Sequence, residues 1–76
     1  MKINRIKLSN RLSSAMQAVR NFTHAPCNVA TLSQQLGLAP GVVYNAKYGR
    51  VDIKITQALE LKDFIGCAVS DLMDSK

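Results

Sequence analysis

The side chains best suited to recognition chemistry lie between positions 41 and 48. If a helix in this segment buries Val43 and Ala46, its other residues face outward at three- and four-residue spacing. The outward residues are Gly41, Tyr44, Asn45 and Tyr48, with Val42 at the margin. An asparagine amide can form two hydrogen bonds with an adenine edge, and valine or tyrosine can touch a thymine methyl group. These residue types suit contact with the bases of a duplex.

Positive charge is concentrated in the first two thirds of the chain. The 76 residues include ten Lys or Arg and five Asp or Glu, a net charge of +5. Residues 1–54 hold eight of the bases and one acid, Asp52, whereas residues 55–76 hold two bases and four acids. This distribution favours a polyanionic partner for the first two thirds and not for the end.

Patterns for catalysis, metal binding and membrane insertion are weak. Asp71 and Asp74 lie close together in a predicted helical tail. We expect both carboxylates to be solvated and not to act as an acid and base in a cleft. Cys27 and Cys67 lack the paired spacing of a zinc site, so we expect small buried side chains in a reducing cytoplasm. No apolar run reaches the length of about 18 residues that a membrane span needs. We expect a non-enzyme without metal or cofactor.

Apolar residues recur with helical period and predict an all-α chain. A first helix ends near residue 22, with Ser9 as a cap of its first turn. Its inner face is predicted to hold Leu8, Leu12, Ala15, Met16, Val19 and Phe22. A second helix begins after Asn28 and ends at Gly37, where a left-handed residue is favoured. Its buried residues are predicted to be Val29, Leu32 and Leu36.

The second half of the chain divides at proline and glycine. A third helix starts at Pro40, whose missing N–H costs nothing there, and stops at Gly49. A fourth spans residues 55–65, with Gly66 as terminator. Its residues available to the core are Ile55, Ala58, Leu59, Leu61 and Ile65. A last short turn carries Val69, Leu72 and Met73, and the segment 50–55 is ambiguous.

The segment TLSQQLGLAPGVVYNAKYGR resembles the helix-turn-helix of the Cro and phage-repressor (Xre-like) family. Two helices that cross closely need a small residue such as Ser33 on the first and a left-handed turn residue such as Gly37. Modest packing residues, Val43 and Ala46, are needed on the second. The resemblance covers about residues 28–73 and implies one lambda-repressor-like domain over residues 1–76, a compact bundle of about five short helices with a central helix-turn-helix at 28–50.

The resemblance implies a map of DNA contacts, with the third helix in the major groove. The residues expected to read bases are Gly41, Val42, Tyr44 and Asn45. The residues expected to contact the DNA backbone are Asn28, Tyr48 and Arg50, with Lys47 and Lys54 as additions. Ala39 departs from the family pattern, which places a Ser or Thr cap before the third helix. The N-terminal bases Lys2, Arg5, Lys7 and Arg11 form either a solvated end or a basic arm around the duplex.

The expected function is a sequence-specific regulator of a phage or mobile element, in the bacterial cytoplasm, that binds operator DNA as a homodimer and represses by occlusion. The apolar candidates for a dimer surface are Ile53, Ile55, Val69, Leu72 and Met73, or Ile3 and Ile6. The alternative is an antitoxin of the same family that binds a toxin and represses its own operon. Only three residues follow the last predicted turn, which disfavours a long tail wrapped around a toxin. An RNA-binding module is disfavoured because its aromatic sheet platform is missing.

Overall fold

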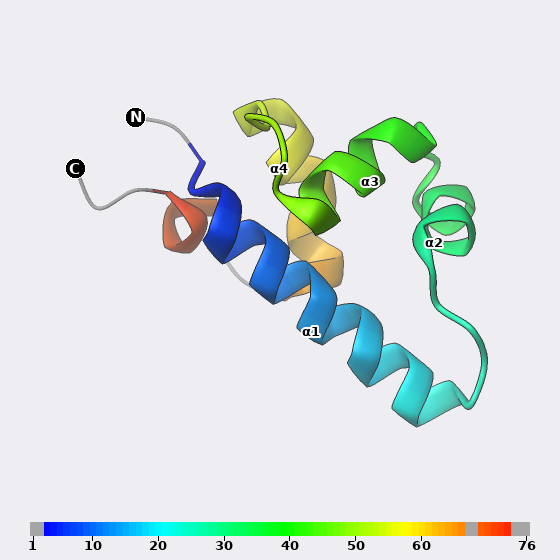
Figure 1. Ribbon diagram of the computed structural model, residues 1–76. Coiled ribbons are helices and arrows are strands. Elements are labelled where there is room, and N and C mark those ends of the chain that lie inside the picture. Colours follow the sequence, from blue (N-terminus) through cyan, green and yellow to red (C-terminus); the bar gives the residue numbers. More distant parts are fainter. Residues whose placement is uncertain (1–2, 67–68, 74–76) are drawn as a thin grey trace.

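Four α-helices and a short 3₁₀-helix follow one another along the part of the chain that the structure describes (Figure 1). This computed structural model describes residues 3–66 and 69–73. The elements are α1 (Arg5–Thr23), α2 (Val29–Leu36), α3 (Pro40–Tyr48), α4 (Ile55–Ile65) and the 3₁₀-helix η1 (Val69–Leu72). The radius of gyration is 11.7 Å, close to the value of about 11 Å expected for a compact domain of this length. The prediction of an all-helical chain is confirmed.

The first helix begins earlier than the sequence predicts. The Asn4 carboxamide oxygen accepts hydrogen bonds from the backbone N–H groups of Ile6 and Lys7, both at 3.0 Å, so Asn4 is the N-cap of α1. The prediction that Ser9 caps this helix is wrong, because no residue after Asn4 interrupts the helix and Ser9 lies inside it. The bases at positions 5, 7 and 11 therefore belong to α1 and do not form an extended arm, whereas Lys2 lies outside the described residues.

The other helix ends agree with the predictions. Asn28 and Thr31 form a reciprocal capping box at the start of α2, with Thr31 N–H to Asn28 Oδ1 and Asn28 N–H to Thr31 Oγ1 both at 2.9 Å. Gly37 ends α2 with a φ of 69°, a left-handed conformation that L side chains rarely adopt. Pro40 is the first residue of α3, and Ala39 before it supplies no side-chain cap.

The core lies where the four helices meet and is almost entirely aliphatic. Fully buried side chains come from every helix, including Leu8, Leu12, Met16, Leu32, Val43, Ala46, Ala58, Leu61 and Leu72. Burial of one such leucine contributes about 1.5–3 kcal/mol, so this cluster dominates the stability of so small a chain. Cys27 is also buried, as predicted, whereas Cys67 lies outside the described residues.

Several apolar residues predicted for the core are exposed. Phe22 is 87% exposed, because the last turns of α1 extend beyond the other helices (Figure 1). On α4, Ala58 and Leu61 point inward, so Ile55 and Leu59 turn outward and are 40% and 47% exposed. The predicted core assignments of these three residues are wrong.

The dimer-surface candidates divide in a similar way. Ile3, Ile53 and Leu72 are buried within their own chain, so the prediction that they are available to a partner is wrong. Ile6 is 73% exposed, and Val51, next to the predicted candidates in sequence, is 45% exposed. Within residues 3–66 and 69–73, no helix has both the length and the apolar character needed to cross a membrane.

Candidate functional site

The candidate site is built on the connection between α2 and α3. Ser33, on the inner side of α2, is 2% exposed, and its hydroxyl donates to the carbonyl oxygen of Val29 one turn earlier. Its polar group is therefore satisfied within α2, so a small side chain is buried there without an unpaired hydroxyl. The turn is closed by Leu38 N–H to Ser33 O at 3.0 Å. These local contacts make α2 and α3 adjacent after a connection of three residues.

The two sides of α3 differ sharply. Val43 and Ala46 are fully buried, as the sequence predicts. Tyr44 and Tyr48 are 42% and 50% exposed, which confirms the expectation that they are not core aromatics. Their ring centroids lie 4.7 Å apart with an interplanar angle of 50°. The two rings therefore form a continuous aromatic surface along the outer side of the helix.

Asn45 lies beside this aromatic surface and is half-buried. Its backbone carbonyl accepts from Gly49 N–H at 2.9 Å, but its side-chain amide makes no hydrogen bond within the described residues. Gly41 is exposed near the start of α3, and a side chain added there would meet nothing within 4 Å. Val42 is half-buried at the margin of the outer side. The predicted base-reading residues therefore share one short helix.

Positive charge adjoins the tyrosines at the end of α3. The Lys47 ammonium group lies 4.4 Å from the centroid of the Tyr48 ring and 3.5 Å from its hydroxyl oxygen. A cation over an aromatic face is stabilised by the ring quadrupole, which limits the positions of a flexible side chain. Arg50 follows two residues after α3, and its guanidinium makes no hydrogen bond or ion pair within the described residues.

The remaining predicted site residues lie on other elements. Lys54 is the residue before α4, where its backbone N–H donates to Gln57 Oε1 at 3.2 Å and its side chain is exposed. Asn28 is exposed at the start of α2, but its Oδ1 is occupied by the capping bond to Thr31. Six of the nine predicted site residues thus lie on α3, and the other three come from the ends of neighbouring elements.

Two residues at the start of α1 contact this site, and the sequence did not identify them as part of it. Ser9 donates its hydroxyl to the carbonyl oxygen of Lys47, in the last turn of α3. Arg5 donates from its terminal guanidinium nitrogen to the carbonyl oxygen of Arg50 at 3.2 Å. Both contacts join residues about forty positions apart, so no local pattern in the sequence could signal them.

Gly49 lies at the centre of this junction. Its φ is 63°, and a Cβ atom built on it would lie 3.3 Å from the Arg5 carbonyl oxygen and 3.6 Å from Ser9 Cβ. The backbone of α3 therefore comes so close to α1 that glycine is favoured for space as well as for conformation.

The described residues contain no group of three or more His, Cys, Asp or Glu side chains that could hold a metal ion. Comparisons with protein-family models, with curated proteins and with solved structures found no match. The feature of the described residues best suited to recognition is an aromatic and amide surface on one short helix, bordered by bases.

Proposed function

We propose that the chain is a sequence-specific regulator that binds double-stranded DNA, with α2 and α3 acting as a lambda-repressor-like helix-turn-helix. The observation that carries the proposal is the division of α3, which buries Val43 and Ala46 completely and exposes Tyr44 and Tyr48 on the other side. A helix anchored along one side and open along the other suits the major groove, which is about 12 Å wide and admits an α-helix. The proposal includes the helix-turn-helix spacing of Ser33, Gly37, Val43 and Ala46, which resembles that of the Cro and phage-repressor family.

Base recognition in this proposal depends on the open side of α3. The Asn45 amide has no partner inside the described part of the protein, so it can give a donor and an acceptor to an adenine at no cost in internal hydrogen bonds. Tyr44 and Val42 can contact a thymine methyl group. The lack of a side chain at Gly41 lets the first turn of α3 approach the duplex.

Backbone contacts come from the ends of α2, α3 and α4. The cation of Lys47 lies in the last turn of α3, and those of Arg50 and Lys54 follow this helix. Tyr48 can donate its hydroxyl to a phosphate. Asn28 retains its amide N–H₂ group for a phosphate while its oxygen caps α2. The net charge of +5 raises the local concentration of the protein near DNA.

A single unit of this size offers a small interface to DNA, so the proposal includes a homodimer that reads two half-sites about 34–36 Å apart. The proposed dimer surface includes three exposed apolar residues: Val51 in the segment after α3, and Ile55 and Leu59 on α4. The proposed mode of repression is occlusion of a promoter by the bound dimer.

The proposal is tested by selecting preferred duplexes from a random pool at high salt and measuring their affinity by fluorescence anisotropy. Asn45→Ala is compared with Asn21→Ala, which makes the same chemical change in the exposed last turns of α1, away from α3 (Figure 1). Because a bidentate base contact contributes about 1–3 kcal/mol of discrimination, we expect Asn45→Ala to weaken binding to the preferred duplex roughly 5- to 150-fold. Asn21→Ala is expected to bind like the wild type.

Binding that is weak, lost at high salt, equal for all duplexes and unchanged in Asn45→Ala would contradict the proposal. That result would favour the other interpretation, in which the chain binds a protein partner such as a toxin.

A further inference from the structure

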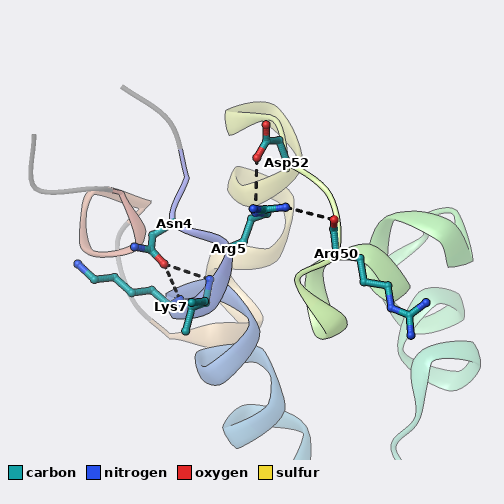
Figure 2. Close-up of polar contacts among 6 residues, drawn as sticks. Asn4, Arg5, Lys7, Arg50 and Asp52 are labelled. Atoms are coloured by element: carbon teal, nitrogen blue, oxygen red, sulfur yellow. Dashed lines mark hydrogen bonds and ion pairs between the residues drawn. The ribbon is translucent and has the colours of Figure 1, made fainter.

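Arg5 connects the first turn of α1 to two points in the segment between α3 and α4. One terminal guanidinium nitrogen donates to the Arg50 carbonyl oxygen at 3.2 Å, and Nε lies 3.6 Å from Asp52 Oδ1 (Figure 2). The Arg5 and Asp52 side chains are 46% and 70% exposed, so the ion pair lies at the surface. One planar side chain thus bridges a backbone oxygen and a carboxylate two residues further along.

The neighbouring contacts restrain the same stretch of chain. Ser9 donates to the carbonyl oxygen of Lys47, and Gly49 packs against the Arg5 backbone. The backbone is therefore in contact with the first two turns of α1 at three positions: Lys47, Gly49 and Arg50. The position of the Arg50 backbone is set by α1, although the Arg50 guanidinium itself bonds to none of the described residues.

The contacts with α1 set the direction in which the Arg50 side chain points. In Figure 2 its carbonyl oxygen faces Arg5, and its guanidinium points away from both Arg5 and Asp52. Asp52 is also the single acid among residues 1–54. An unpaired carboxylate there would repel a polyanion, and its pairing with Arg5 offsets that charge.

We propose that Arg5 is a positioning residue for DNA binding: it does not touch the duplex, and together with Asp52 it holds the segment after α3 so that the Arg50 guanidinium faces a phosphate. This inference rests on the proposed function. It assigns Arg5 a role that depends on its contacts with Arg50 and Asp52 and not only on its charge.

Two substitutions separate positioning from charge. Asp52→Asn removes an acid, so electrostatics alone predicts tighter binding, whereas loss of the positioning contact predicts weaker binding. Arg5→Lys keeps the charge but cannot bridge both acceptors in a planar fork. The matched control is Arg11→Lys, the same change on the exposed side of α1 at a residue with no hydrogen bond or ion pair in the described part of the chain.

Affinity for the preferred duplex is measured for each variant over a range of salt concentrations, with thermal unfolding alongside. We expect Asp52→Asn and Arg5→Lys to weaken binding about two- to tenfold and Arg11→Lys to bind like the wild type. Loss of one phosphate contact lowers the slope of log K against log salt by about one in magnitude. Adding Arg50→Ala to Asp52→Asn is expected to cause little further loss, because both changes remove the same contact.

Binding by Asp52→Asn that is equal to or tighter than that of the wild type would overturn the positioning role while leaving the proposed function intact. Losses of binding free energy that add in full in the double variant Asp52→Asn with Arg50→Ala would also overturn the positioning role. Full additivity would mean that Asp52→Asn weakens binding by a route independent of Arg50. A wild-type protein that prefers no duplex would instead overturn the proposed function, and the positioning role with it.

Discussion

Replacement of Gly49 by alanine tests the close contact between α1 and the end of α3. Gly49 and Gly37 have nearly the same left-handed conformation, with φ of 63° and 69°. At Gly37 an added Cβ would meet nothing within 4 Å, whereas at Gly49 it would lie 3.3 Å from the Arg5 carbonyl oxygen. Gly37→Ala is therefore a matched control that carries the conformational cost without the contact.

The magnitudes follow from these two differences. A left-handed alanine costs about 1–2 kcal/mol relative to glycine, and this cost applies to both variants. The short contact with a backbone oxygen of α1 cannot be relieved by a side-chain rotation, and such overpacking adds about 1–3 kcal/mol. We expect Gly37→Ala to lose about 1–2 kcal/mol of unfolding free energy and Gly49→Ala to lose at least about 1 kcal/mol more.

Thermal and urea unfolding of both variants measure this difference. Because 1 kcal/mol shifts the midpoint of a domain of this size by roughly 4–8 °C, the two variants are expected to differ in Tm by at least that much. Equal destabilisation of Gly37→Ala and Gly49→Ala would refute the close approach of α3 to α1, and an unchanged Tm in both would refute the left-handed helix ends.

Two further predictions concern the start of α3. Ala39 gives α3 no side-chain cap, so Ala39→Ser is expected to raise the unfolding free energy, measured in urea, by about 1 kcal/mol; no gain would indicate that the first turn is not the helix start. Gly41 is helical with open space around it, so Gly41→Ala is expected to add about 0.5–1 kcal/mol of stability while weakening binding to the preferred duplex. A variant that is both more stable and binds fully would argue against approach of the backbone to DNA at Gly41.

The helix ends were predictable from sequence because the chemistry that sets them is local. An acceptor at Asn28, a ring at Pro40 and a glycine at Gly37, Gly49 or Gly66 each act on the nearest turn of backbone. The start of α1 was misplaced because both Asn4 and Ser9 can cap a helix, and the choice between them depends on how far the helix extends toward η1. Asn4 N–H donates to the Leu72 carbonyl oxygen at 2.7 Å, a contact between distant parts of the chain.

The burial errors have a different cause. Apolar periodicity shows that a helix has an inner side, but it does not show where neighbouring helices stop. Phe22 continues the apolar stripe of α1 into a part of the helix that no other described element covers. On α4, the stripe is broad enough to include Ile55 and Leu59, and it is packing against α1 and η1 that selects Ala58 and Leu61. In the candidate site, the outward residues of α3 were predictable because Val43 and Ala46 leave a single choice of inner side.

The absence of a cap on α3 has a consequence for its dynamics. A helix of nine residues without a side-chain cap is far too short to persist alone in water. Its backbone hydrogen bonds last only while Val43 and Ala46 remain packed in the core and the last turn remains bound to Ser9. Amide hydrogens in the middle of α3 are therefore expected to be protected from exchange only while the helix stays packed against α1 and α2. The helix proposed to read DNA is therefore expected to lose its order together with its contacts to α1.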